Sequence, residues 1–288
     1  MDGKLSYVIL VLIFIILVYI FNRHRREHFE ERKDVKEVAH YIKRNDQDAP
    51  TVISNVPTVI YNSWHSNMVP PKMLENIMDN IAMNPDFDYY LYSDESSEEY
   101  IKNNYSLDVL NAFHTLKPGA FKSDLWRYCI LYKMGGVYMD IKYKTLEPLR
   151  YILAKSPNVF VKDYDHLRTD KCFYNGVMIS PPNNKIFKYC IDEIVDNCRM
   201  KLYTLSPLSL TGPCLLGKSL KRFKDPQWNT PKFTYESYKE YDRSERVDYI
   251  SYDNRCIIQS YKGYRVEQMM YQKTEAYGKM WMEGQIFN

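Results

Sequence analysis

The chain has 288 residues, of which 45% are hydrophobic and 26% are charged. This composition allows a sizeable buried core and excludes a chain that is disordered throughout. The formal net charge is only +3, so no overall basic character indicates a nucleic-acid-binding protein, and we expect no nucleic-acid partner.

The first element in the chain is an uncharged apolar run from Leu5 to Phe21. A transmembrane helix needs about 17 to 25 apolar residues. Tyr7 and Tyr19 lie near its ends, where aromatic residues favour the membrane interface. Because no small-x-small cleavage site follows, the run favours an anchor over a cleaved signal peptide. The sequence predicts a single transmembrane helix over residues 5–22, with a membrane as partner.

Basic residues crowd the start of the segment that follows. Arg23, Arg25 and Arg26 outweigh Lys4 on the other side of the run, which by the positive-inside rule keeps the rest of the chain in the cytosol. Residues 23–56 are polar and charged as a whole, and we expect them to form a stalk.

Strand and helix patterns alternate in the remainder, residues 57–288, which we expect to be one domain. The first elements predicted from β-branched runs and helical spacing are a strand over 58–61, a helix over 72–78, a strand over 88–92 and a helix around 98–105. A β-α-β-α order with short connections is typical of an α/β fold with a mostly parallel central sheet.

The six cysteines form no Cys-x-x-Cys pair and do not alternate with histidine at zinc-ligand spacing, so we expect no structural metal site. Their even number permits disulfides, but a chain of this length does not need them. We expect buried free thiols, and the cysteines do not indicate whether the protein resides in an oxidising or a reducing compartment.

A further helix is predicted from Ser123 to Met134, because Ser123 suits an N-cap and Gly135-Gly136 suits the end of a helix. Asp124 and Arg127 are three residues apart and are therefore neighbours on its surface. Taken alone, these two residues favour a solvated ion pair.

A strand is predicted directly after the two glycines, over 137–144. Alternation along a strand places Tyr138, Asp140 and Lys142 on one face. Burying a carboxylate and an ammonium group on one face is costly without a charged partner, and a diphosphate, with or without a divalent metal, is such a partner. An edge strand with its charged face in water explains the pattern equally well.

The segments 123–128 and 131–140 read Ser-Asp-Leu-Trp-Arg-Tyr and Leu-Tyr-Lys-Met-Gly-Gly-Val-Tyr-Met-Asp. They resemble the signature of the family 32 glycosyltransferases, the Asp-x-Asp sugar-binding group. Further segments that resemble the family occur in its order, at 56–64, 85–92, 175–182 and 211–213.

This resemblance implies a GT-A-type nucleotide-sugar-binding fold and a retaining glycosyltransferase. Such an enzyme transfers a hexose from a UDP- or GDP-sugar to a glycan, lipid or protein acceptor. The resemblance also implies a single-pass protein of the Golgi or ER membrane with its body in the lumen. That orientation conflicts with the positive-inside rule applied to Arg23, Arg25 and Arg26, so a body in the cytosol remains the alternative.

The resemblance also assigns roles to individual residues. Asp124 and Arg127 match the pair that orients the donor's sugar hydroxyls, and Asp140 matches the first Asp of the motif, which binds ribose and, partly through metal, the diphosphate. The other residues expected to bind the donor are Tyr138 beside Asp140, Trp64 near the base, Asn175 near the sugar and Trp281 in the C-terminal tail. Trp64 would be equally ordinary in a core, and Asn175 in a turn.

Lys142 departs from the family pattern, because it stands where the family has its second Asp, the main metal ligand. An ammonium group offers no oxygen to Mn²⁺ or Mg²⁺. A metal could still bind through Asp140 with Asp163 or Asp165, or Lys142 could itself neutralise the diphosphate as a fixed charge and bind the donor. The alternative to an enzyme is a membrane-tethered pseudoenzyme that binds nucleotide-sugar or carbohydrate. Since all three predicted catalytic residues are present, we expect activity.

Overall fold

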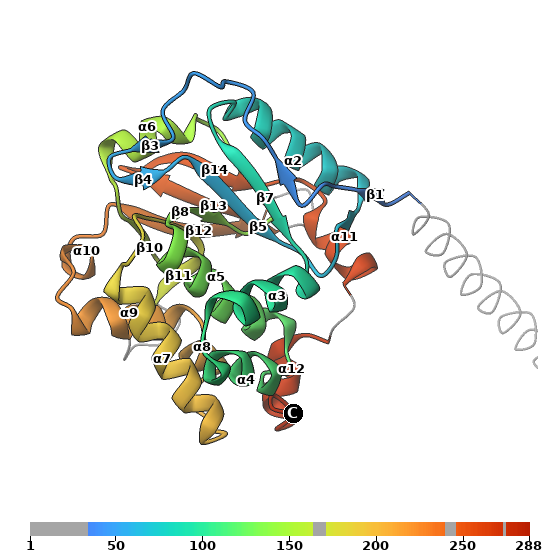
Figure 1. Ribbon diagram of the computed structural model, residues 1–288, viewed down its shortest axis with the longest axis vertical. Coiled ribbons are helices and arrows are strands. Elements are labelled where there is room, and N and C mark those ends of the chain that lie inside the picture. Colours follow the sequence, from blue (N-terminus) through green and yellow to red (C-terminus); the bar gives the residue numbers. More distant parts are fainter. Residues whose placement is uncertain (1–33, 164–170, 240–245, 273–274) are drawn as a thin grey trace, which may run out of the picture.

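The computed structural model describes residues 34–163, 171–239, 246–272 and 275–288. They form a mixed α/β fold around a ten-stranded sheet with helices on both faces (Figure 1). The order across the sheet is β2 (Tyr41–Ile42), β7 (Asp88–Tyr92), β5 (Val59–Ser63), β8 (Gly136–Met139), β11 (Phe173–Ser180), β10 (Val159–Lys162), β12 (Phe233–Lys239), β13 (Arg246–Tyr252), β14 (Arg255–Ser260) and β9 (Tyr143–Thr145). Two short pairs join β1 (Lys36–Glu37) to β6 (Met68–Val69) and β3 (Val52–Ile53) to β4 (Val56–Pro57).

The helices in the described residues are α2 (Pro71–Met83), α3 (Asp94–Asn104), α4 (Leu107–Thr115), α5 (Gly119–Met134), α6 (Leu149–Lys155), α7 (Lys185–Arg199), α8 (Pro207–Leu210), α9 (Pro213–Arg222), α10 (Pro226–Asn229), α11 (Tyr264–Tyr271) and α12 (Tyr277–Met282). The predicted elements 58–61, 72–78 and 88–92 correspond to β5, α2 and β7, and the helix expected around 98–105 falls largely within α3.

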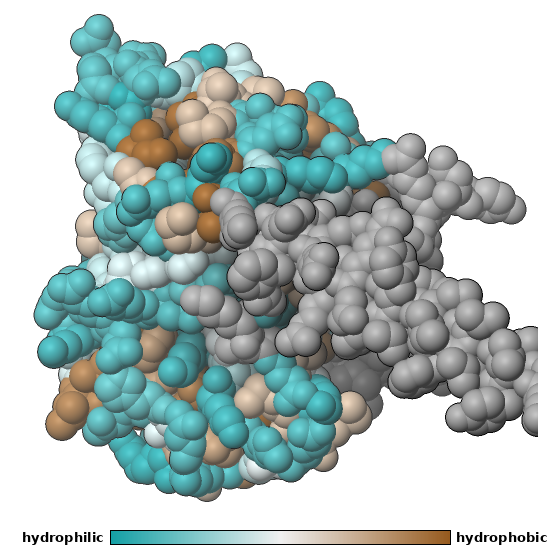
Figure 2. Space-filling model, turned by 90° about the vertical axis from the view of Figure 1, so that its right-hand side faces the viewer, coloured by the Kyte–Doolittle hydropathy of each residue, from teal (hydrophilic) through white to brown (hydrophobic). Residues whose placement is uncertain are grey.

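The sheet separates two apolar cores. Along β8, Val137 and Met139 pack into the core that α2 and α6 cover, whereas Tyr138 packs into the core under α3, α4, α5 and α7. On the face shown in Figure 2, the described surface is mostly hydrophilic, with apolar residues in small separate groups. The large apolar side chains are therefore mainly inside, as the composition indicates.

The expectation of a mostly parallel sheet is wrong. Of the nine neighbouring strand pairs in the described sheet, only β5–β7, β5–β8 and β10–β12 are parallel. The short connection between β13 and β14 permits only antiparallel pairing, and β11 returns beside β8 in the opposite direction. The alternating β-α-β pattern describes the first half of the sheet only.

The predicted strand over 137–144 is interrupted. β8 ends at Met139, residues 140–142 form a turn, and β9 begins at Tyr143 at the far edge of the sheet. The predicted helix over 123–134 begins earlier than expected, at Gly119 after Pro118, so Ser123 is not its N-cap. Alternation therefore does not place Asp140 and Lys142 on one strand face.

The stalk expected over 23–56 is wrong for its described part. β2 pairs with β7 at the edge of the main sheet, and Val38 and Val56 are buried in the core. This burial makes residues from 36 onward part of the folded body. The predicted anchor over 5–22 and residues 23–33 lie outside the described residues, and no helix within the described ranges has the length and apolarity to cross a bilayer.

The expectation of free thiols holds for four of the six cysteines. Cys172, just before β11, forms a disulfide with Cys214 on α9, across a sequence separation of 42. The free cysteines are Cys129, Cys190 and Cys198, which are buried, and Cys256, which is half-buried.

Three buried asparagines, two on α2 and one at its C-cap, hold the segment that follows β8. Asn76 donates from Nδ2 to the backbone oxygens of Ile141 and Tyr143, at 2.9 and 3.0 Å. One turn on, Asn80 donates to the Tyr143 oxygen at 2.7 Å and accepts from the Thr145 backbone N–H at 2.9 Å. Asn84, a further turn on, accepts from the Leu149 N–H at 2.7 Å. This spacing of four residues places all three amides on one helix face.

We expect Asn80→Ala to lower the free energy of unfolding by about 1–3 kcal/mol, because it removes the acceptor of a buried backbone N–H. Met78→Ala changes an exposed position of the same helix and serves as the control, with an expected change below about 0.5 kcal/mol. Urea unfolding of both variants measures the difference, and equal losses would show that the asparagine contacts do not stabilise the fold.

A chain shortened to begin at Asp34 keeps β2 and the buried Val38, whereas one that begins at Pro57 loses both. Because exposing or deleting one buried valine costs about 1.5–3 kcal/mol, we expect the shorter chain to unfold several degrees lower in a thermal melt. Identical midpoints would restore the stalk interpretation of the segment.

Candidate active site

Asp140 lies in the turn directly after β8, and its backbone is fixed from two sides. Its N–H donates to the Gly176 oxygen at 2.7 Å, and the amide of Asn62 on β5 donates to the Met139 oxygen at 2.6 Å. A side chain at Gly176 would not fit, since a Cβ there would lie 2.5 Å from Oδ2 of Asp140. The glycine thus allows β11 to approach this carboxylate.

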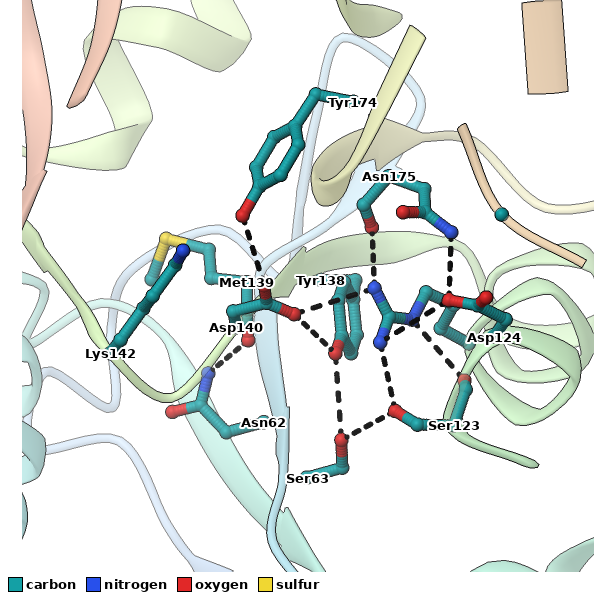
Figure 3. Close-up of polar contacts among 12 residues, drawn as sticks. Asn62, Ser63, Ser123, Asp124, Tyr138, Met139, Asp140, Lys142, Tyr174 and Asn175 are labelled. Atoms are coloured by element: carbon teal, nitrogen blue, oxygen red, sulfur yellow. Dashed lines mark hydrogen bonds and ion pairs between the residues drawn. The ribbon is translucent and has the colours of Figure 1, made fainter. Parts of the chain in front are cut away.

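The carboxylate of Asp140 accepts two tyrosine hydroxyls (Figure 3). Tyr138 donates to Oδ1 and Tyr174 to Oδ2, each at 3.0 Å. Nη1 of Arg127 lies 3.4 Å from Oδ1. Three neighbours therefore orient one partly exposed carboxylate, and Tyr138 lies beside Asp140 as predicted.

Arg127 joins Asp140 to Asp124. Its Nη2 lies 3.6 Å from Oδ1 of Asp124, its Nη1 donates to the Asn175 backbone oxygen at 2.9 Å, and its guanidinium lies 4.5 Å from the ring centre of Tyr138. Arg127 and Asp124 are 7% and 8% exposed, so the pair is buried and the solvated ion pair is wrong. The three predicted catalytic residues form one contiguous chain.

Asp124 is further held by two polar side chains. Asn175 donates from Nδ2 to its Oδ1 at 2.8 Å, and Thr211 donates to its Oδ2 at 2.7 Å. Asn175 lies inside β11, so the plain-turn interpretation of Asn-Gly is wrong. Sequence reasoning missed Tyr174 as a site residue, whereas Thr211 belongs to segment 211–213, which we expect from the sequence to border the donor pocket or to form an ordinary turn.

Burial affects the two charges of this pair differently. It raises the pKa of Asp124, against the opposing effect of Arg127 and the two hydrogen bonds. Burial also works to lower the pKa of Arg127, but Tyr138 and the two carboxylates outweigh it and raise that pKa. Arg127 is therefore a permanent positive charge between the two carboxylates.

Two cavities meet at Asp140. The smaller, about 200 Å³, is lined by Trp64, Ser63 and Arg127, and the larger, about 400 Å³, by Asp124 and Asn175 among others. Both are also lined by Ala120, Asp140, Tyr264 and Gln268. The indole N–H of Trp64 is buried and has no hydrogen-bond partner among the described residues. An unpaired buried donor in a cavity wall suits an acceptor on a ligand.

Trp281 does not reach either cavity. It lies on α12, with its ring centre 5.2 Å from that of Tyr203. The C-terminal residues that line both cavities are instead Tyr264 and Gln268 of α11. Residues 261–281 were expected to return over the donor, but α11 has no motif in the quoted segments, so the sequence did not single out these two residues.

Lys142 lines the larger cavity and forms a buried ion pair. Its Nζ lies 2.6 Å from Oδ2 of Asp248 on β13. Asp248 also binds Arg246 at 3.0 Å and Arg265 at 3.2 Å. Burial works to raise the pKa of Asp248, but Lys142 and Arg265 outweigh it and lower that pKa to about 2. The prediction that Lys142 shares a strand face with Asp140 is wrong, yet both residues line the same cavity.

The described side chains do not fit the metal site that Asp140 was expected to provide. A guanidinium already lies 3.4 Å from the Asp140 carboxylate, and Lys142 supplies an ammonium where a cation needs an oxygen ligand. Asp163 lines the larger cavity, but within the described ranges no group of three or more His, Cys, Asp or Glu could hold a metal ion. Asp165 lies outside the described residues.

We expect Asp248→Asn to lower the free energy of unfolding by about 3–5 kcal/mol near neutral pH, because it leaves Lys142, whose pKa burial already lowers, without the carboxylate that favours its charged form. Because the pKa of Asp248 is lowered from 3.8 to about 2 in the folded state, ionised Asp248 stabilises the fold fully at pH values above 3.8. This contribution is lost as the pH falls through about 2. The difference from wild type, measured by urea unfolding, should therefore shrink in acid.

Asp192→Asn is the control for this change, since Asp192 pairs with Lys188 on the surface, where such pairs contribute about 0–1 kcal/mol. A loss in Asp248→Asn no larger than that of the control, or a difference that stays constant into acid, would contradict the assignment of a buried charged pair.

Comparisons with known proteins match the segment of the chain that contains Asp124, Arg127 and Asp140. Residues 70–159 match the family model described as glycosyltransferase sugar-binding region containing DXD motif. Inositol phosphoceramide mannosyltransferase 3 of Schizosaccharomyces pombe is 33% identical over 34% of this chain and 28% of its own length. Inositol phosphoceramide mannosyltransferase 2 of the same yeast is 28% identical over 62% of this chain and 50% of its own length.

A solved structure, PaToxG Glycosyltransferase, aligns with a TM-score of 0.45 and 16% identity over 61% of this chain and 72% of that one. The chain spans half or less of the length of these two yeast relatives. The matched segment contains α5, β8 and Asp140, the elements on which the resemblance was drawn, and the resemblance is confirmed. Residues 70–159 of this chain are therefore similar to the sugar-binding region of the DXD-containing glycosyltransferases.

Proposed function

We propose that this chain is a retaining glycosyltransferase that moves a hexose from a nucleoside-diphosphate sugar to an acceptor hydroxyl. One observation carries the proposal: the ion-paired series Asp124–Arg127–Asp140 runs between two cavities that share Asp140. A donor of this class has a base, a diphosphate and a sugar in sequence. Two cavities joined at a charged residue suit such a molecule.

The smaller cavity suits the nucleoside. Trp64 offers a face for stacking, worth about 1–3 kcal/mol per base in related sites, and a buried N–H with no partner among the described residues. The position of Asp140 and Ser63 at the carboxyl ends of the parallel strands β8 and β5 supports a GT-A-type nucleotide-sugar fold, since ligands of α/β sheets bind there.

The larger cavity suits the donor sugar. Asp124 presents its carboxylate there, oriented by Asn175, Thr211 and Arg127, so it can accept hydrogen bonds from sugar hydroxyls. The work of these residues is to orient the anomeric carbon and to exclude water. In a same-face displacement the departing phosphate takes the acceptor's proton, which accounts for retention without a nucleophilic side chain.

The names of the yeast relatives suggest the sugar and the acceptor. Two yeast proteins that match the chain are named inositol phosphoceramide mannosyltransferases. We therefore propose mannose as the hexose and a lipid with a phosphorylated headgroup as the acceptor, with glycan and protein acceptors as alternatives in a screen. An anchor over residues 5–22 in a Golgi or ER membrane would bring the site to such an acceptor.

The test is sugar transfer by the full chain in a screen of UDP- and GDP-sugars. We expect Arg127→Lys to lower turnover about 100- to 1,000-fold, because a shorter single ammonium cannot bridge two carboxylates and a backbone carbonyl. Arg199→Lys makes the same substitution in an exposed pair on α7 and should leave turnover unchanged.

A wild-type chain that is folded, binds a nucleoside diphosphate in calorimetry and turns over none of these donors would contradict the enzyme and support the pseudoenzyme. The observation that favours this second candidate is Lys142, which replaces the second acidic residue of the motif.

A further inference from the structure

Three cations surround one carboxylate at the side of the larger cavity. Lys142 from the turn after β8, Arg246 from β13 and Arg265 from α11 all contact Asp248. Asp248 itself has 1% of its side chain exposed, whereas the side chains of Arg246 and Arg265 are 46% and 42% exposed. One buried negative charge therefore holds three positive charges, all of which line the larger cavity.

Asp248 does not use all the hydrogen-bonding capacity of the two arginines. Arg246 donates from Nε to Asp248 and from Nη2 to the Tyr235 hydroxyl at 2.9 Å, and its Nη1 has no partner among the described residues. Arg265 bonds Asp248 and Gln268. An arginine carries five N–H donors, so each has donors left for a ligand in the cavity.

The negative side chains that line the same cavity are already engaged. Asp124 and Asp140 are both within 3.6 Å of Arg127, and Asp163 has an interaction of its own. The cations around Asp248 thus form the positive end of this cavity, with three positive charges to one negative, whereas Asp124 and Asp140 share the one guanidinium of Arg127. They suit a ligand with two or more negative oxygens.

The proposal rests on the proposed function and deepens it. We propose that Lys142, Arg246 and Arg265 form a phosphoryl-binding site that takes the place of a divalent cation in this chain. Lys142 stands where the family motif has its second acidic residue, and it lines the cavity that Asp140 shares with the nucleoside side. Fixed cations stabilise negative charge on a diphosphate without a metal.

The phosphoryl group can come from the donor's diphosphate or from a phosphorylated acceptor headgroup. The donor is favoured, because Lys142 is two residues from Asp140, where the two cavities meet. Asp248 then acts as a positioning residue that gathers the three cations without touching the ligand.

The experiment is calorimetric titration of inorganic pyrophosphate into the full chain in the presence of EDTA. We expect wild type to bind, and Arg265→Gln and Arg246→Gln each to bind about 10- to 100-fold more weakly, the value of one charge-assisted hydrogen bond. Arg255→Gln removes the same charge from an exposed pair with Glu147 and should bind like wild type. Thermal melts confirm that each variant is folded.

A second arm repeats the titration with saturating nucleoside diphosphate. Loss of pyrophosphate binding assigns the site to the donor, and retained binding assigns it to an acceptor phosphate. The proposal is overturned if pyrophosphate binds only after Mn²⁺ is added, or if both arginine variants bind like wild type. Sugar transfer that requires Mn²⁺ would overturn it while leaving the proposed function intact. A chain that binds no nucleoside diphosphate, with or without Mn²⁺, would instead contradict the proposed function.

Discussion

The contact between Arg127 and two carboxylates is the constraint on which the site depends. Two aspartates that share a cavity repel each other, and burial raises the pKa of Asp124. A guanidinium that lies within 3.6 Å of both allows them to remain close together. Arg127 is also rigidly placed, because it is stacked on Tyr138 and bonded to the backbone of β11. The geometry of Asp124 relative to Asp140 therefore follows from one side chain on α5.

Asp140, one of the two carboxylates in this contact, is held in place by the rest of the fold. Asp140 occupies a turn, where backbone conformation is less restricted than in a strand. Asparagines of α2 and β5 donate to the backbone oxygens of the residues on either side of Asp140, and the backbone oxygen of Gly176 accepts the Asp140 N–H. These bonds cross between elements that are far apart in the sequence, so the turn is fixed by tertiary structure. Loss of one amide would loosen the carboxylate without removing any residue that lines the cavity.

Local pattern was sufficient for part of the fold. β5, α2 and β7 follow from β-branched runs and helical spacing. The contact between Asp124 and Arg127 follows from their separation of three residues, but the burial of the pair does not. The prediction of a parallel sheet failed beyond β8, because nothing in the local sequence distinguishes a strand that pairs with the preceding strand from one that pairs elsewhere in the sheet. β9 shows this well: it lies three residues after β8 but pairs with β14 at the opposite edge.

The residues that sequence reasoning missed are those whose role depends on distant partners. Asp248 is an ordinary strand residue until Lys142, more than 100 positions earlier, is placed beside it. The replacement of the second acidic residue by lysine was visible in the sequence, but its consequence was not. An isolated lysine in that position would repel a metal and leave the cavity unbalanced. Lys142 instead pairs with Asp248 and lines the cavity together with two arginines, which gives this side of the cavity a positive charge. The substitution is therefore compatible with binding of an anion and does not by itself imply loss of function.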